Sequence, residues 1–296
     1  MIITRLIGGL GNQMFQYASG LALASKLDCE VKVDISDLAK YKLHNGYELE
    51  KVFESNFQIA TDDDKDAVLG FCNNFFFKKI ISTNIIKLPF RTYAAEPHFH
   101  YWKGIHDLQK NVYLDGYWQS EKYFSSIKSK LRKKFTFKRI IDSHNLCLFN
   151  NIKKTNAVSI HIRRGDYLTN SKANSFFGVC PLSYYHNAVN FMSRNISNPT
   201  FYIFSDDINW AKENFKIDKP HYFLDHNSGK SNWVDMNLMS LCNHNVIANS
   251  SFSWWGAWLN SNPNKIVLYP SKLFININID SSDYCPASWK SIKINQ

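Results

Sequence analysis

The segment from His161 to Tyr167 carries two adjacent arginines and a carboxylate directly after an apolar run. Alternation along a strand places His161 and Arg163 on one face and directs Arg164 to the other. A guanidinium is a permanent planar cation whose donors match the oxygens of a phosphate or diphosphate. The segment therefore predicts a nucleotide site with Arg163 in contact, and the alternative is a structural ion pair between Arg164 and Asp166.

A second candidate site lies at residues 249–258, where serines follow an apolar strand and open a helix. Residues 250–252 offer hydroxyls and unpaired backbone amides at that helix start. Together with Arg163 they could hold a diphosphate without a metal ion. The alternative is that Ser253 caps the helix while the tryptophans fill the core.

Glycines at positions 8, 9 and 11 join a predicted strand, Ile2–Ile7, to a predicted helix, Met14–Lys26. Such a loop lets backbone amides approach an anion or a sugar closely, although it could also serve packing alone. The glycine order departs from the dinucleotide fingerprint, because Gln13 and Met14 follow where a third glycine is expected. A nicotinamide enzyme is therefore disfavoured.

Several acids have two possible roles. Asp206 and Asp207 end another strand, where such pairs can bind a divalent metal, but capping of the next helix is favoured. Asp235, on a predicted helix, could accept both N1–H and N2–H of a guanine, although a lone helical aspartate is usually on the surface. The cluster Asp62–Asp64 is interpreted as a solvated turn.

The elements that position these residues form two βα alternations, which predict an α/β protein with parallel sheets. We expect domains at residues 1–153 and 154–275, with residues 276–296 as a tail that packs back on them. The boundary is set by a polar stretch at residues 150–156. The second half is predicted as a doubly wound unit with strands at Ala157–Ile162, Thr200–Phe204, Asn245–Ala248 and Lys265–Tyr269, and helices at Pro181–Arg194, Ile208–Phe215, Trp233–Cys242 and Ser253–Leu259.

The composition supports a globular protein with an anionic partner. The 35 Lys and Arg exceed the 25 Asp and Glu by ten charges, which favours a phosphorylated ligand or an anionic membrane. The six cysteines are scattered, which argues against a zinc site and suits reduced thiols in a cytosol. No run is long enough to span a bilayer, so we expect a cytoplasmic or peripheral protein. A basic helix at Lys128–Lys138 also leaves a nucleic-acid-binding protein as a distant alternative, but no recognised binding module accompanies it.

Taken together, four segments resemble the α-1,2-fucosyltransferases of glycosyltransferase family 11. They span most of the chain, and their order and strand contexts match. The segments are GGLGNQMFQYA (Gly8–Ala18), HIRRGDY (His161–Tyr167), FSDD (Phe204–Asp207) and NSSFSWWGAW (Asn249–Trp258).

The resemblance implies a GT-B fold, in which two Rossmann-like lobes face a central cleft and GDP-fucose binds mainly to the C-terminal lobe. It implies inverting transfer of L-fucose to the 2-hydroxyl of a terminal galactose, with no metal or other cofactor required. The setting would be bacterial O-antigen synthesis on a lipid-linked acceptor at the inner face of the plasma membrane, with no nucleic acid. Another GDP-sugar transferase or another fucosyl linkage remains the alternative.

The resemblance also implies a role for each motif residue. Arg163 would grip the diphosphate and Asp166 would orient the arginine pair. His161 would line the guanine pocket and Asp235 would recognise the guanine edge. The remaining donor contacts would come from Ser250, Ser251 and Phe252 at the helix start, and from Gly9, Gly11 and Asn12 in the other lobe. No residue identifies itself as the general base, because Asn12 could position the acceptor but not deprotonate it.

Overall fold

The computed structural model describes residues 1–39, 45–70, 92–140, 142–165, 178–275 and 278–294. The chain forms two compact units: Met1–Lys138 with Ser282–Tyr284, and Arg139–Ser281 with Cys285–Gln296. The division lies before the predicted boundary at residue 153, because the helix α6 (Ser143–Lys154) packs on the second unit's strand β5 and helix α11. The polar stretch at residues 150–156 is the end of that helix and the start of β5.

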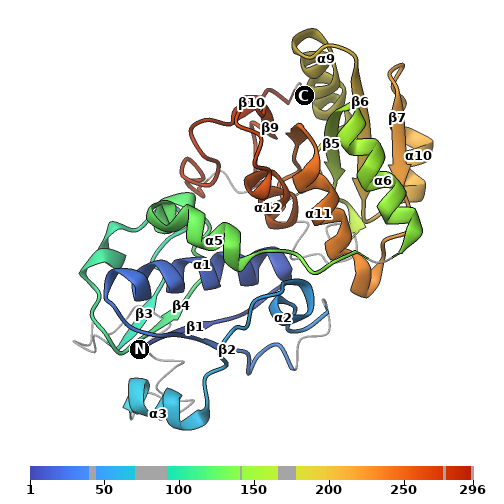
Figure 1. Ribbon diagram of the computed structural model, residues 1–296. Helices are drawn as coiled ribbons and strands as arrows, with labels where there is room; N and C mark the ends of the chain where they lie inside the picture. Colours follow the sequence, from blue (N-terminus) through green and yellow to red (C-terminus); the bar gives the residue numbers. More distant parts are fainter. Residues whose placement is uncertain (40–44, 71–91, 141, 166–177, 276–277, 295–296) are drawn as a thin grey trace. The chain divides into compact units, whose positions relative to one another are not determined.

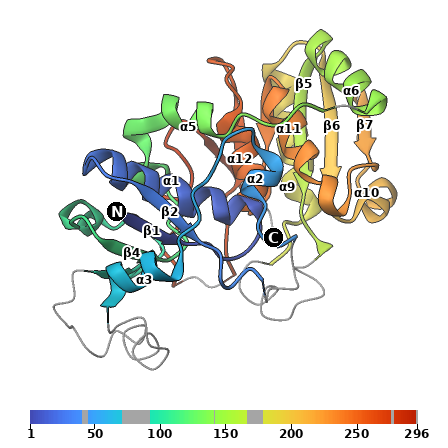
Figure 2. The same cartoon turned by 60° about the horizontal axis from the view of Figure 1, so that its bottom comes forward.

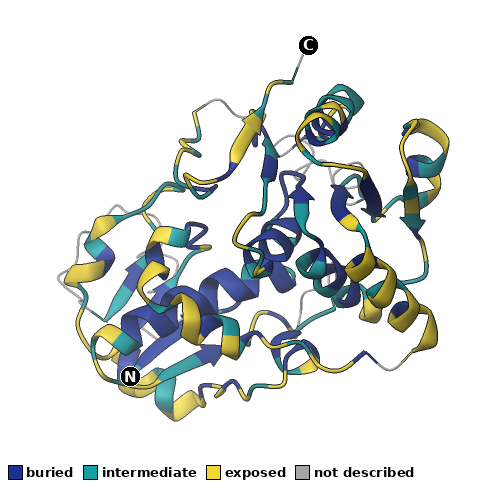
Figure 3. Cartoon of the chain, turned by 45° about the horizontal axis from the view of Figure 1, so that its top comes forward, coloured by how far each residue is buried: buried dark blue, intermediate teal, exposed yellow. Residues whose placement is uncertain are grey.

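The first unit contains a parallel four-stranded sheet in the order β2-β1-β4-β3 (Figure 1). Its strands are β1 (Ile2–Arg5), β2 (Val31–Asp34), β3 (Tyr93–Ala95) and β4 (Val112–Asp115). Successive side chains of β1 face opposite layers: the Thr4 hydroxyl donates to Gln16 O of α1 (Leu10–Lys26), whereas Ile3 packs with Val68 of α3 (Asp62–Leu69). The helix α1 is buried along most of its length (Figure 3).

Two predictions for this unit are wrong. The helix α1 begins at Leu10, four residues before the predicted start, so Gly11, Asn12 and Gln13 belong to its first turn. The acids Asp62–Asp64 belong to the first turn of α3 instead of a loop turn, because Thr61 and Asp64 cap each other's backbone N–H groups; Asp62 and Asp63 are exposed, as predicted. The shorter elements are α2 (Leu49–Val52), α5 (Lys128–Lys134) and three 3-10 helices, η2 (Lys103–Asp107), η3 (Glu121–Tyr123) and η4 (Ser125–Ile127).

The second unit contains a parallel six-stranded sheet in the order β10-β9-β8-β5-β6-β7, and β5, β6 and β7 run side by side in both views (Figures 1 and 2). Numbered within the unit, this is the Rossmann strand order, in which the direction of winding reverses between the first and fourth strands. The strands are β5 (Asn156–Ile162), β6 (Pro199–Ser205), β7 (His221–Leu224), β8 (His244–Val246), β9 (Val267–Pro270) and β10 (Lys290–Ile292).

Helices cover both faces of this sheet, which confirms the predicted doubly wound unit. Side chains of α9 (Leu182–Asn195) and α10 (Ile208–Asn214) join Val158 and Ile160 of β5 in one core. On the opposite face, Asn245 bridges Ser159 of β5 to Met239 O of α11 (Trp233–Leu241). A 3-10 helix, η5 (Gly229–Ser231), precedes α11, and α12 (Ser251–Leu259) packs beside it.

Candidate functional site

The sequence motifs of the second unit meet at the carboxyl ends of β5 and β8. These strands are neighbours, with Val158 opposite His244 and Ile160 opposite Val246. The winding of the sheet reverses at this point, and ligands of doubly wound sheets bind in the crevice outside the carboxyl ends of such strands. The arginine motif follows β5 and the serine motif follows β8, so the fold brings both predicted halves of the nucleotide site to one edge.

Asp206 fixes the arginine segment. Its Oδ1 accepts from Arg164 N at 2.8 Å, and its Oδ2 accepts from Gly165 N at 3.0 Å and lies 3.2 Å from Arg163 Nε. A Cβ atom on Gly165 would lie 2.9 Å from that Oδ2, so a larger residue would displace the carboxylate. Sequence analysis missed this role and favoured helix capping. The signal available was that Asp206 directly follows β6, the parallel neighbour of the strand that precedes the arginines.

Arg164 is held apart from Arg163 by other partners. Its guanidinium carbon lies 3.4 Å above the centre of the Trp210 ring, and its Nε lies 3.6 Å from Asp207 Oδ2. Asp207 also caps α10 by accepting from Trp210 N at 3.4 Å, which confirms capping for this acid. Asp166, the predicted partner of the arginine pair, lies outside the described residues. Stacking and pairing make Arg164 a structural cation.

His161 is buried in β5 and its ring lies 5.7 Å from that of Phe252. Burial and the nearby charge of Arg163 lower the pKa of His161 to about 3. The imidazole is therefore neutral at physiological pH, and it adds no positive charge to the site.

The helix α12 begins two residues earlier than predicted. Ser250 is its cap, with Oγ accepting from Phe252 N at 3.3 Å. Ser253 is buried inside the first turn, where its hydroxyl accepts from Ala248 N and donates to Ser250 O. Trp255 and Trp258 are buried, which confirms that they belong to the core. The first turn of α12 itself contains no acid, so no carboxylate of that turn neutralises the partial positive charge of the helix start.

Asp235 is buried, at 8% exposure, although a lone helical aspartate suggested the surface. Its Oδ1 accepts from Asn227 Nδ2 at 2.8 Å, and Asn227 also donates to Asn145 Oδ1 at 3.0 Å. Burial raises the pKa of Asp235 to about 7, against the smaller opposing effect of the Asn227 hydrogen bond. The amides come from α6 and from the loop after β7, and no local sequence pattern connects them to Asp235.

The glycine loop of the first unit is folded around a buried acid. Gly8 adopts φ +76°, and a Cβ there would lie 2.5 Å from Asn12 Nδ2. The start of α1 receives its capping acceptor from Glu48, whose Oε2 accepts from Leu10 N at 3.2 Å. This distant cap explains why the helix begins at Leu10. Asn12 itself accepts a hydrogen bond from Gln119 Nε2 at 2.7 Å.

Gln13 ties this loop to the chain around Glu48. Its Nε2 donates to Gly8 O at 3.0 Å and to Gly46 O at 2.9 Å, and its Oε1 accepts from Glu48 N at 3.0 Å. Gln13 is fully buried, so the glycine loop has one fixed shape. No local sequence pattern indicates the role of Glu48.

The sequence profile described as Glycosyl transferase family 11 matches residues 1–276. The chain belongs to glycosyl transferase family 11. It is 36% identical over 299 residues to an alpha-1,2-colitosyltransferase of Escherichia coli, covering 99% of each chain. It is 34% identical over 289 residues to the O-antigen biosynthesis glycosyltransferase WbnK of Escherichia coli, covering 92% of this chain and 95% of the relative.

The crystal structure of the fucosyltransferase NodZ from Bradyrhizobium shares the fold of this family 11 chain. It superposes with a TM-score of 0.51 at 12% identity over 86% of this chain and 91% of NodZ. A crystal structure of NodZ, an α-1,6-fucosyltransferase, soaked with GDP-fucose matches with a TM-score of 0.50. The α/β GT-B fold predicted from the sequence is confirmed.

Within the described parts of the chain, no three His, Cys, Asp or Glu side chains gather closely enough to hold a metal ion. Of the helices that the structure describes, none combines the length and apolar character required to cross a bilayer.

Proposed function

We propose that this glycosyltransferase transfers L-fucose from GDP-fucose to the 2-hydroxyl of a terminal galactose, with inversion and without a required metal, in bacterial O-antigen synthesis. The observation that carries the proposal is the edge of the second sheet, where Asp206 fixes Arg163 between two strands and α12 begins without an acid. This edge is suited to a diphosphate. The names of the two Escherichia coli relatives support the glycan, and the soaked NodZ crystal supports the donor.

The proposed chemistry is a single displacement. The acceptor hydroxyl attacks the anomeric carbon of fucose while GDP departs through a transition state with oxocarbenium character. Negative charge then grows on the leaving phosphate, and a cation already in place stabilises the transition state more than the ground state. Arg163 supplies that cation in the proposal, and Ser250, Ser251 and the Phe252 amide complete the phosphate contacts.

The guanine would be recognised by Asp235, with His161 lining the pocket. An ionised carboxylate accepts both N1–H and N2–H of guanine, which adenine and uracil cannot both provide. Asp166 remains the predicted orienting acid and Gly9, Gly11 and Asn12 remain predicted contacts of the first unit. Because Glu48 already lies at the start of α1, we assign these three residues to the sugar rather than to a phosphate.

The 36% identity to a colitosyltransferase favours one other donor. Colitose is fucose without its 3-hydroxyl, so GDP-colitose is the second candidate. Purified protein is incubated with GDP-fucose or GDP-colitose and a panel of β-galactosides, and the product linkage is assigned by NMR. We expect an α-1,2-fucosyl product. Faster transfer from GDP-colitose would show that colitose, and not fucose, is the sugar transferred. A product linkage other than 1→2 would contradict the proposed α-1,2 specificity.

The proposed lipid-linked acceptor places the enzyme at the cytoplasmic face of the membrane. The helix α5 has the sequence KSKLRKK and no acid, and such a segment is attracted to anionic headgroups. Pelleting with vesicles of anionic or neutral lipid, at low and high salt, tests this contact. We expect binding to anionic vesicles alone, weakened by salt, and binding that ignores both variables would remove the proposal.

A further inference from the structure

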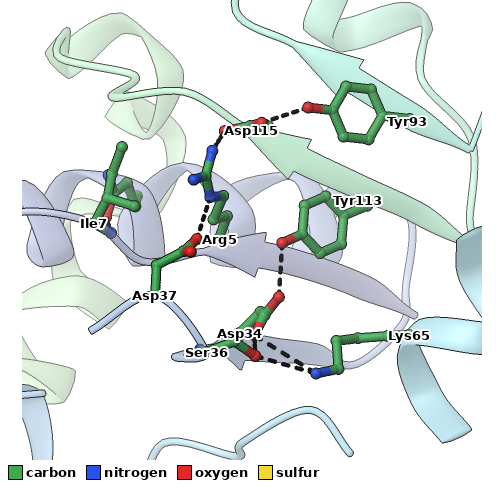
Figure 4. Close-up of polar contacts among 10 residues, drawn as sticks. Arg5, Ile7, Asp34, Ser36, Asp37, Lys65, Tyr93, Tyr113 and Asp115 are labelled. Atoms are coloured by element: carbon green, nitrogen blue, oxygen red, sulfur yellow. Dashed lines mark hydrogen bonds and ion pairs between the residues drawn. The ribbon is translucent and has the colours of Figure 1, made fainter. Parts of the chain in front are cut away.

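The carboxyl edge of the first unit's sheet is rich in acids, most of which are occupied by cations or hydroxyls. Figure 4 shows Arg5 between Asp115 and Asp37, with contacts of 2.8 and 2.7 Å. Tyr93 donates to Asp115, and Tyr113 donates to Asp34 at 2.7 Å (Figure 4). These ion pairs and hydrogen bonds to neighbouring side chains give each of these acids a structural role.

Glu96 differs from its neighbours because, among the residues that the structure describes, its carboxylate is held by backbone amides alone. It follows β3, and its own N–H donates to Asp115 O at 2.8 Å. Its Oε2 accepts from Tyr117 N at 2.7 Å and its Oε1 accepts from Trp118 N at 3.0 Å. A Cβ on Gly116 would lie 2.4 Å from Glu96 Cβ, so the glycine is required for this approach. Each carboxylate oxygen has a second lone pair with which to accept a proton.

The turn that holds Glu96 is strained and leads to the glycine loop. Trp118 adopts φ +54° while fully buried, and a bulky side chain in this region costs about 1–3 kcal/mol. The next residue, Gln119, donates to Asn12 of α1 at 2.7 Å. Tyr117, on the other side of Trp118, is 43% exposed. One strained turn thus joins the half-buried Glu96, the exposed Tyr117 and Asn12.

We propose that Glu96 is the general base that takes the proton from the acceptor hydroxyl, with Tyr117 beside it as the aromatic surface for the galactoside. The inference rests on the proposed glycosyl transfer. The acceptor O–H proton passes to the Glu96 carboxylate, and the acceptor oxygen forms a bond to the anomeric carbon. The bond from that carbon to the phosphate oxygen breaks, and its electron pair leaves with GDP.

The surroundings of Glu96 suit a base that works near neutral pH. Burial raises the pKa of Glu96 to about 7, and the charge of Asp115 adds to this increase, against the two amide hydrogen bonds. The other titratable group that faces it is Tyr123 of η3, and no Lys or Arg of the described chain forms an ion pair with it. A base acts when ionised, so turnover limited by Glu96 rises with pH through about 7 and then levels.

The wild-type protein gives a first test that requires no variant. The kcat/KM for the acceptor is measured at saturating donor from about pH 5.5 to 9, so that the ionisation of Asp235, which governs donor binding in the proposal, does not limit the rate. We expect a rising limb with an apparent pKa near 7. A flat profile across this range would overturn the assignment.

The variant Glu96→Gln then tests whether Glu96 is the group whose ionisation produces the rising limb. We expect kcat to fall by about two to four powers of ten, as for the loss of a general base, and the limb near pH 7 to disappear. GDP affinity, measured by calorimetry, stays within about twofold. Glu96→Asp keeps a carboxylate and recovers part of the rate with a displaced limb. A Glu96→Gln enzyme that turns over with the wild-type limb would refute the base.

Asp64→Asn is the matched control, because Asp64 is a carboxylate of the same unit that also accepts from a backbone N–H, that of Thr61 at 2.9 Å. It should lower the melting temperature and leave the pH profile unchanged. If Glu96→Gln does not fold, the pH profile of Glu96→Asp is compared with that of the wild type. A Glu96→Asp enzyme with the wild-type apparent pKa and the wild-type rate would contradict the proposal. If the donor proves to be another sugar, the same assays are run with that donor, so an error in the donor is distinguished from an error in the base.

Discussion

Each unit contains a helix that follows a strand of its sheet, α1 after β1 in the first unit and α12 after β8 in the second, and the two helix starts are capped in opposite ways. At the start of α1, the Glu48 carboxylate lies 3.2 Å from Leu10 N. At the start of α12, the Ser250 hydroxyl is the cap and no acid lies in the first turn. A carboxylate already satisfies the dipole of α1, whereas α12 retains its attraction for an anion. This difference supports the proposal that the edge at α12 takes a phosphate and the edge at α1 a neutral sugar.

The arginines that end the first strand of each unit show the same contrast. Arg5 is clamped by two carboxylates, those of Asp37 and Asp115. Arg163 is 21% exposed and its ion pair uses Nε and one oxygen of Asp206. Two carboxylates around the Arg5 guanidinium leave that cluster with a net negative charge, which opposes the binding of a phosphate.

Replacing these arginines should have the largest and most divergent effects. Arg163→Ala is expected to lower kcat by about two to three powers of ten, because it removes the cation on the leaving phosphate, while the melting temperature stays near wild type. Arg163→Lys should recover little, since the planar fork is lost. Arg5→Ala should instead lower the melting temperature and leave GDP affinity unchanged. Near-normal turnover by a folded Arg163→Ala protein would contradict the contrast.

Asp206→Asn should have the next largest effect. A hydrogen bond to a charged group contributes about 1.5–3 kcal/mol, so losing the orientation of Arg163 should lower kcat about tenfold to a hundredfold. Steady-state kinetics with KM and kcat measured separately test this, and the decrease should be in kcat. Asp166→Asn is the comparison variant. If Asp166→Asn were the more damaging of the two, Asp166 would be the orienting acid, as the sequence predicted.

The sequence predicted the second unit better than the first because its elements are encoded locally. Strand β6 was predicted at Thr200–Phe204 and observed at Pro199–Ser205, since an apolar run between polar flanks identifies a buried strand. The missed strands β7 and β10 are short and lie at the sheet edges, where one face carries little apolar signal.

The first unit was harder because its decisive contacts join distant residues. The start of α1 depends on Glu48, 38 positions away along the chain, so no local pattern could place it at Leu10. The role of Asp206 was hidden for the same reason, because its three partners lie on the neighbouring strand end. Motif residues were thus readable from the sequence, and the residues that orient them were not.

The proposed contact between Asp235 and guanine gives a further test of the nucleotide site in the second unit. Its pKa of about 7 lies above the usual value near 4, so it stabilises the fold below about pH 4 and that contribution is lost as pH rises through 7. GDP binding requires the ionised form, so GDP affinity should rise over the same interval. Asp235→Asn should weaken GDP about tenfold and remove both pH dependences.

Inosine diphosphate, which lacks the N2 amine, is the control ligand for that experiment. Wild type should prefer GDP over inosine diphosphate by calorimetry, and Asp235→Asn should lose this preference. A variant that still discriminates between the two nucleotides would show that another group recognises the guanine edge.

The smallest effects should come from giving α12 the cap of α1. Ser250→Ala removes the cap and should lower the free energy of unfolding by about 1 kcal/mol.

Ser250→Asp should keep the cap and, like Glu48, add a favourable charge to the helix dipole, so stability is retained. That charge opposes a diphosphate by about 1 kcal/mol at contact distance in water, which corresponds to about fivefold weaker GDP binding. For both variants, calorimetry measures GDP affinity and chemical denaturation measures the free energy of unfolding, so the effect on binding is separated from the effect on stability. If Ser250→Asp bound GDP as tightly as wild type, the start of α12 would not be the phosphate site, and the contrast between the two helix starts would have no functional meaning.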